Sequence, residues 1–155
     1  MGITIEKGSL KYLHDCIRAL ADSELGRQYF SAEASAERAI QEGLDQGTLY
    51  VALVQGICVG FAWYLPNGVF HGFPYLHIIA VSAECRGKGI GRALVDFVEN
   101  LVFANADKLF LVVAQFNPQA RRFYEKAGYQ QVGIIPDLYR EGISEYLMMK
   151  RRPTL

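Results

Sequence analysis

Apolar residues recur along this chain with two different periods, and the period changes near residue 48. A short alternating segment, 3–6, predicts a first strand, and the apolar residues between 10 and 20 recur at helical spacing. Residues 22–47 are polar and rich in alanine, so we expect one weakly amphipathic helix flanked by mobile loops.

Segments rich in β-branched and aromatic residues follow. Residues 48–54 and 57–65 are separated by Gln55-Gly56, which predicts a hairpin. Pro66-Asn67-Gly68 predicts a turn before a further strand over 73–81. The later segments predict a helix over 90–102, a covered strand over 109–116, a short helix over 117–128 and closing strands over 129–135 and 144–150.

This order of elements predicts an α/β chain with one central mixed sheet and helices on both faces. At 155 residues the default is a single domain over 1–155. No apolar segment approaches the roughly 18 residues of a membrane span, and no signal peptide begins the chain. The three cysteines have no paired spacing, which favours a reducing compartment. We therefore expect a cytoplasmic protein with no membrane partner.

Charge excludes some classes of partner. The chain has 16 Lys and Arg against 16 Asp and Glu, which argues against a nucleic-acid coat protein. The halves differ, however: residues 1–75 hold 5 basic and 8 acidic side chains, and residues 76–155 hold 11 and 8. If the acidic half borders the substrate, the acceptor is a cation.

A glycine-rich loop, residues 86–92, lies between a predicted strand and a predicted helix. Glycines let backbone N–H groups converge, and the helix N-terminus behind them adds a positive dipole end, so the loop can bind phosphate. The loop fails the dinucleotide-binding pattern, which needs Gly where Arg92 stands. It also fails the Walker A pattern, because Gly89 follows Lys88 where Ser or Thr is required.

The loop resembles the acyl-CoA pyrophosphate loop of the GNAT superfamily of N-acetyltransferases, through Arg86, Gly89 and Gly91 after an apolar strand. A second segment, Asn117 to Tyr129, is similar to that family's Asn-x-x-Ala-x-x-Phe-Tyr-x-x-x-Gly-Phe pattern. The resemblance covers residues 48–150 and is weak over 7–47. It implies a mostly antiparallel sheet with a splayed strand pair.

The resemblance implies acetyl transfer from acetyl-CoA to an amine by direct attack in a ternary complex. The residues expected to bind the co-substrate are Ile79, Val81, Arg86, Gly87, Lys88, Gly89, Ile90, Gly91, Arg92, Asn117, Ala120, Tyr124 and Lys126. By the same resemblance, the strand ending at Val81 splays from its neighbour, and the Val81 N–H is the candidate donor to the oxyanion.

Tyr124 is the candidate general acid, because a phenol is protonated at neutral pH and matches the basicity of an alkyl thiolate. His77 is the candidate base, and alternation places it on one strand face with Ile79 and Val81 unless a bulge shifts the register. Glu145 and Glu141 are alternatives to it, and a dedicated base need not exist.

Two other chemistries are disfavoured. The three histidines show no metal-ligand spacing, so no metal is expected. Cys85 precedes the loop without an adjacent histidine motif, which disfavours a covalent intermediate. The aromatic residues Trp63, Tyr64, Phe70, Phe73 and Tyr75 are candidates to line an acceptor pocket, and residues 139–142 are expected to form an acceptor-facing loop.

The leading hypothesis is an N-acetyltransferase acting on a primary amine of a small molecule. The alternatives are a protein N-terminal or lysine acetyltransferase of the same fold and a non-catalytic acyl-CoA-binding module. Dimers are common in the family, so a homodimer is left open.

Overall fold

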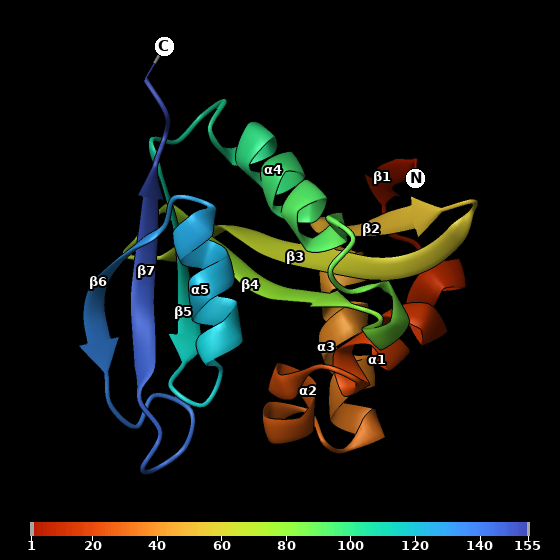
Figure 1. Cartoon of the computed structure of the whole chain (residues 1–155), viewed down its shortest axis with the longest axis horizontal. Helices are drawn as coiled ribbons and strands as arrows, with labels where there is room; N and C mark the ends of the chain where they lie inside the picture. The colour runs from red at the N-terminus through yellow and green to blue at the C-terminus, as the bar shows by residue number, and fades with distance from the viewer. Residues whose placement is uncertain (1, 155) are drawn as a thin grey trace.

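A seven-stranded mixed sheet in the order β1-β2-β3-β4-β5-β7-β6 organises the computed structural model, which describes residues 2–154 (Figure 1). All neighbouring strands are antiparallel except β4 and β5. The strands are β1 (Ile3–Lys7), β2 (Leu49–Val54), β3 (Ile57–Val69), β4 (Phe73–Val81), β5 (Lys108–Ala114), β6 (Gln130–Ile135) and β7 (Glu145–Arg151). The helices are α1 (Leu13–Ala21), α2 (Glu24–Tyr29), α3 (Glu33–Gln46), α4 (Ile90–Val102) and α5 (Pro118–Lys126), with short 3-10 turns at Leu10–Tyr12 and Ala83–Cys85.

Helices cover both faces of the sheet, as predicted (Figure 1). On one face α1 and α3 pack with Trp63 of β3 and Ile78 of β4 into a buried cluster. On the other face α4 and α5 pack with Leu76 of β4 and Met148 of β7 into a second cluster. The mixed α/β fold class is therefore confirmed.

The sheet is divided between β4 and β5. These strands pair in parallel at one register position, Tyr75 with Phe110, and beyond that position they diverge. The expected splayed pair is therefore present, and it leaves a gap toward the C-terminal ends of both strands that the rest of the site uses.

The segment 22–47 is not one helix but two, α2 and α3. The Ser23 hydroxyl caps α2 by accepting from the Gly26 N–H at 2.9 Å. A Cβ at Gly26 would lie 1.7 Å from the Leu20 carbonyl oxygen, so the chain passes α1 at a distance that only glycine permits. This contact packs α2 against the end of α1. The break before α3 lies at residues 30–32, where Phe30 (φ −132°, ψ 43°) and Ala32 (φ −84°, ψ 129°) leave the helical conformation, which helical periodicity alone did not indicate.

The predicted turn at Pro66-Asn67-Gly68 is also wrong, because these residues lie within β3. The register jumps from Leu65 opposite Tyr75 to Val69 opposite Phe73, so the three residues form an irregular bulge. Proline is tolerated there because a bulge needs no ladder donor from it. The chain reverses at Phe70 and His71, whose φ angles are 50° and 68°.

Candidate active site

Two cavities meet where β4 and β5 diverge. The smaller has a volume of about 340 Å³ and lies between α2, β4, β5, α5 and the loop joining β6 to β7. The larger, about 1140 Å³, runs past the glycine-rich loop at the N-terminus of α4. The residues lining both cavities are Ile79, Phe116, Asn117 and Ala120. A molecule in one cavity can therefore reach a molecule in the other at this junction.

The glycine-rich loop takes the shape expected of an anion-binding turn. Gly87 and Gly89 have φ angles of 75° and 85°, and Gly89 is the N-cap of α4. No neighbouring atom lies within 4 Å of a Cβ built on either glycine. The loop therefore leaves its backbone N–H groups, at the positive end of a 13-residue helix, beside an open cavity.

Most residues expected to bind the co-substrate line the larger cavity. They are Ile79, Val81, Arg86, Gly87, Gly89, Ile90, Gly91, Arg92, Asn117, Ala120 and Lys126. Lys88 lines neither cavity, and Tyr124 lines the smaller one. Arg122 and Phe123 line the larger cavity too, and both stand inside the segment that carries the second motif.

The guanidinium of Arg86 is engaged by the protein backbone. Its Nε donates to the Val81 carbonyl at 3.1 Å and its Nη2 to the Asp22 carbonyl at 2.8 Å. Arg92 is paired with Asp96 at 3.0 Å. Arg122 and Lys126 also line this cavity, and their side chains form neither an ion pair nor a hydrogen bond with the described residues, so they are better placed to receive phosphate charge.

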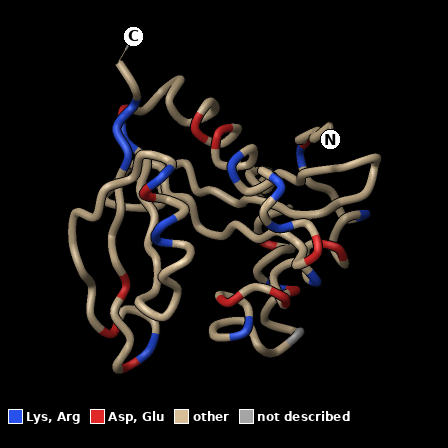
Figure 2. Tube along the Cα trace, viewed as in Figure 1, with Lys and Arg blue, Asp and Glu red and all other residues tan. Residues whose placement is uncertain are grey.

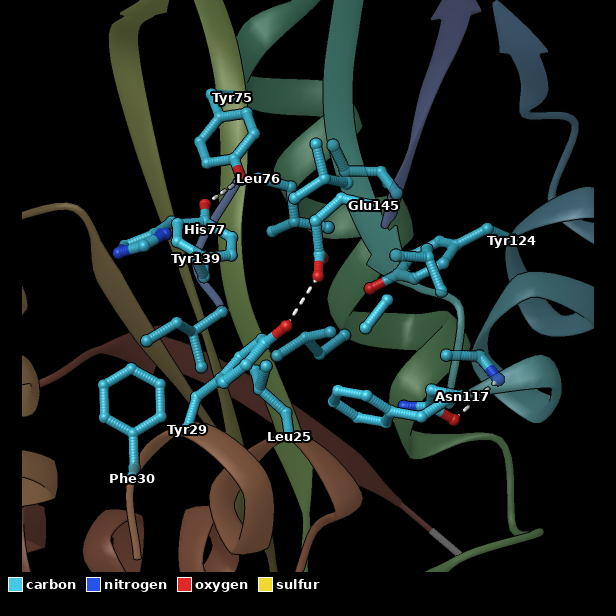
Figure 3. A pocket seen from close by; sticks show the side chains of 18 of the residues that line it. Leu25, Tyr29, Phe30, Tyr75, Leu76, His77, Asn117, Tyr124, Tyr139 and Glu145 are labelled. Atoms are coloured by element: carbon cyan, nitrogen blue, oxygen red, sulfur yellow. Dashed lines mark hydrogen bonds between the residues drawn. The ribbon is translucent and has the colours of Figure 1, made fainter. Parts of the chain in front are cut away.

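Asn117 lies at the junction of the two cavities, and Tyr124 lines the smaller cavity. The Asn117 side chain accepts from the Ala120 N–H at 3.2 Å and so caps α5, as its position before Pro118 predicts. Tyr124 is 6% exposed, and burial raises the pKa of its phenol. Figure 3 shows its hydroxyl pointing into the smaller cavity, toward the side where Glu145 lies.

His77 lies on the smaller cavity but not on the strand face that alternation predicted. β4 has an extra residue there: Ile78 pairs with Trp63, Leu76 pairs with Tyr64, and His77 falls between. The bulge places Leu76 and Ile78 in cores on opposite faces, and it separates His77 from the face of Ile79. The imidazole packs on the Trp63 ring at 4.7 Å between centroids, and burial lowers its pKa.

A hydrogen bond across the smaller cavity joins residues that are 116 positions apart. The Tyr29 hydroxyl of α2 donates to Oε2 of Glu145, the first residue of β7, at 2.7 Å (Figure 3). Glu145 is 2% exposed, and burial raises the pKa of its carboxyl while the bond from Tyr29 lowers it. Nothing in the local sequence around either residue signals this contact.

The aromatic lining differs from the expected set. Of the five candidates, Tyr75 alone lines the smaller cavity, and the others lie elsewhere. The aromatic residues that sequence reasoning missed are Tyr29, Phe30 and Phe116. Tyr139 and Arg140 of the loop before β7 do line it, as expected for residues 139–142. Tyr29 contacts Phe116 and Tyr139 edge to face, each at 5.5 Å between ring centroids.

The acidic first half of the chain does not supply the carboxylate of the smaller cavity. Figure 2 shows acidic positions of the first half on the N-terminal helices. None of them lines the smaller cavity, and Glu24 lines the larger one. The carboxylate inside the smaller cavity is Glu145, which comes from the basic half. The split in charge along the sequence therefore does not account for the charge of the site.

Two further findings concern the described chain. Within residues 2–154, no helix combines the length and apolar content needed to cross a bilayer. Among the side chains that the structure describes, which do not include that of Glu33, no three or more His, Cys, Asp or Glu side chains gather in a way that could hold a metal ion.

Comparison with known proteins agrees with the site geometry. The sequence profile of the acetyltransferase (GNAT) family matches residues 17–129. The chain belongs to the GNAT acetyltransferase family. GNAT enzymes use acetyl-CoA and act on amine acceptors.

Relatives within the family support this assignment. An uncharacterised N-acetyltransferase of Methanocaldococcus jannaschii is 39% identical over 106 residues, which cover 67% of this chain and 66% of the relative. N-alpha-acetyltransferase RimI of Mycobacterium tuberculosis is 34% identical over 97 residues, 62% of this chain and 60% of that protein. These matches thus span less than two thirds of each GNAT relative. The structure of Ard1 from Thermoplasma volcanium shares the fold, with a TM-score of 0.81 at 24% identity, covering 99% of this chain and all (100%) of that one.

Proposed function

We propose that the chain transfers an acetyl group from acetyl-CoA to a primary amine, and that this amine is the N-terminal α-amino group of a polypeptide. The observation that carries the proposal is the junction of the two cavities at Ile79, Asn117 and Ala120, with the Tyr124 hydroxyl directed into the acceptor side. One 155-residue domain suffices for it, because both cavities are built from this chain.

The residues of the larger cavity fit acetyl-CoA. Backbone N–H groups of residues 87–91 and the side chains of Arg122 and Lys126 suit a pyrophosphate. Bound acetyl-CoA supplies the activated acetyl group, and the strand end at Ile79 and Val81 borders its path toward the junction. The Val81 N–H stays the proposed donor to the oxyanion.

Tyr124 is the proposed proton donor to the departing thiolate. Burial raises the pKa of its phenol above the ordinary value of about 10, so the group is protonated at neutral pH. A protonated phenol whose hydroxyl points into the smaller cavity is suited to act as a general acid.

The acceptor is assigned from the relatives and from the cavity. The Mycobacterium tuberculosis relative is named an N-alpha-acetyltransferase, which favours a polypeptide N-terminus. A small-molecule amine is the second candidate, because about 340 Å³ is the size of a small-molecule site.

The test is thiol release from acetyl-CoA with three sets of acceptors: peptides with free N-termini, peptides acetylated at the N-terminus that carry lysine, and small amines including polyamines. We expect release with the first set and none with the second. Release with small amines alone would replace the leading acceptor by the second candidate. Binding of acetyl-CoA with no release in any set would favour a non-catalytic binding module.

A further inference from the structure

Glu145 is a buried carboxylate in the acceptor cavity. It is the one acidic residue among the described residues that line this cavity, and it is 2% exposed. Its position at the start of β7, paired with Ala114 of β5, places it beside the divergence of β4 and β5. Oε2 accepts from the Tyr29 hydroxyl, and Oε1 accepts no hydrogen bond from the described residues.

No cation of the described chain pairs with this carboxylate. The titratable or charged residues that line the cavity around it are Tyr29 from α2, Tyr75 and His77 from β4, Tyr124 from α5, and Tyr139 and Arg140 from the loop before β7. Arg140 is the permanent cation among them, and its guanidinium donates to the Gln28 carbonyl and lies 5.2 Å from the Tyr29 ring centroid. An ionised carboxylate buried without a cation is costly, so a cation supplied by a ligand would stabilise it.

The walls around Glu145 suit an ammonium group. Tyr29, Tyr75, Phe116 and Tyr139 surround the cavity with aromatic rings, whose faces attract cations. Tyr29 is held in place by Phe116 and Tyr139, so its hydroxyl meets Glu145 in a fixed orientation. One carboxylate oxygen is thus held by the protein, and the other is left for a donor in the cavity.

We propose that Glu145 binds the ammonium of the acceptor and accepts its proton, and that Tyr29 is the positioning residue that holds this carboxylate. The inference rests on the proposed function. The acceptor R–NH₃⁺ transfers one proton to the carboxylate, leaving R–NH₂ and a neutral carboxylic acid. The free amine attacks the thioester carbonyl carbon and forms the carbon–nitrogen bond, which gives a tetrahedral oxyanion. The oxyanion then collapses as the carbon–sulfur bond breaks and the thiolate departs. Tyr124 protonates the sulfur and regains a proton from the new amide nitrogen, and Glu145 releases its proton to water.

Substitutions of Glu145 and of Tyr29 should change the pH dependence of activity in different ways. Burial raises the pKa of Glu145, and the hydrogen bond from Tyr29 lowers it because a donor favours the ionised form. A base must be ionised to act, so activity falls as pH drops through this pKa. Removing the Tyr29 hydroxyl removes the lowering influence, which moves the acidic limb of the profile to higher pH.

The experiment measures kcat/KM against pH for the wild type, Glu145→Gln and Tyr29→Phe. The control is Asp45→Asn, which neutralises an exposed carboxylate that lines neither cavity. We expect Glu145→Gln to lose about 100-fold and to lack the wild-type acidic limb. Tyr29→Phe should keep the limb but shift it to higher pH, and Asp45→Asn should match the wild type within about twofold. An unmoved limb in both Tyr29→Phe and Glu145→Gln would overturn the proposal. Loss of the limb in His77→Ala alone would also overturn it and assign the proton to His77.

A binding measurement separates this inference from the proposed function. A tetrapeptide with a free N-terminus and its N-acetylated form are titrated into wild type and Glu145→Gln by calorimetry. We expect the free peptide to bind at least about tenfold more tightly than the acetylated one, and Glu145→Gln to erase the difference. If this result holds without acetyl transfer, the ammonium site stands and the proposed reaction fails. Equal binding of both peptides to the wild type would overturn the ammonium site.

Discussion

The Arg86 guanidinium donates to the main-chain carbonyl of Asp22 at 2.8 Å, across 64 residues of sequence. The same carbonyl accepts from Arg27 of α2 at 2.7 Å. The loop before α4, which borders the larger cavity, is thus tied to the helix that forms a wall of the smaller one. Arg86 therefore supports the shape of both cavities.

We expect Arg86→Ala to weaken acetyl-CoA binding about tenfold, because charge-assisted hydrogen bonds to two carbonyls contribute roughly 1.5 kcal/mol or more. Lys88→Ala is the matched control, since Lys88 lines neither cavity, and it should change the dissociation constant by less than about twofold. Calorimetric titration with acetyl-CoA checks both. A larger loss in Lys88→Ala than in Arg86→Ala would contradict this assignment.

Tyr124→Phe should lower kcat by about 100-fold or more while leaving acetyl-CoA binding unchanged, because it removes a proton donor without changing the ring. Tyr146→Phe is a suitable control, as Tyr146 packs under the Arg121 guanidinium at 4.6 Å and lines neither cavity. Steady-state kinetics at saturating acetyl-CoA are the measurement. Turnover of Tyr124→Phe equal to that of the control would remove Tyr124 from the mechanism.

Asn117 caps α5 and also lies at the junction of the two cavities. Two substitutions distinguish its effect on stability from its effect on acetyl-CoA binding. Asn117→Ala should lower the free energy of unfolding by about 1 kcal/mol through loss of the α5 cap. Asn117→Asp keeps a capping oxygen and should retain the stability, yet weaken acetyl-CoA binding about tenfold by adding negative charge. Urea unfolding and ligand titration are compared, and a stable Asn117→Asp that binds normally would show that the side chain only caps the helix.

The ionised Glu145 side chain should lower the free energy of unfolding at neutral pH. Burial raises the pKa of this carboxyl in the folded chain, so its contribution to stability is fully present below the unfolded value of about 4.3 and is lost as pH rises through the folded pKa. Glu145→Gln should therefore unfold at higher temperature than the wild type at pH 7.5, with the difference narrowing at pH 4. A variant less stable than the wild type at pH 7.5 would mean that the carboxylate is satisfied by the fold.

Lys150 and Glu99 form a partly buried ion pair between β7 and α4, at 2.7 Å and 15% and 9% side-chain exposure. The Tyr129 hydroxyl donates to the second carboxylate oxygen at 2.9 Å. Lys150→Met leaves this carboxylate without its cation and should cost about 3 kcal/mol in urea unfolding. The double variant Lys150→Met/Glu99→Leu should recover part of that loss. If its change in the free energy of unfolding equals the sum of the changes in Lys150→Met alone and Glu99→Leu alone, the two side chains do not interact.

Much of the fold followed from local patterns. The apolar stripe over 90–102 predicted α4, because a helix that buries one face repeats its apolar residues every three to four positions. The continuous apolar segment predicted β5, because a strand covered on both faces buries every side chain. Pro66-Gly68 misled because strand pairing on both sides absorbed three residues as a bulge. His77 was placed on the wrong face for a similar reason, since an extra residue in β4 leaves no trace in its own sequence.

The two halves of the site were unequally predictable. The larger cavity is built from contiguous motifs, whose glycines and cap residues have local physical reasons for their order. The acceptor cavity is built from single residues such as Tyr29 and Glu145, which meet only after the sheet and helices have packed. No spacing rule links positions 116 residues apart, so the sequence named Glu145 only as an alternative base and did not name its partner.

β4 and β5 pair at one register position, Tyr75 with Phe110, whereas every other pair of neighbouring strands has five or more. Tyr75 and His77 lie on the β4 side of this weak pairing. Glu145 lies on the other side, and Tyr124 belongs to the helix that packs there. A small rotation of one part of the sheet against the other would change the separation between the reacting groups without altering any of them. Substitutions at Phe110, which lines neither cavity, would then change the rate through this separation.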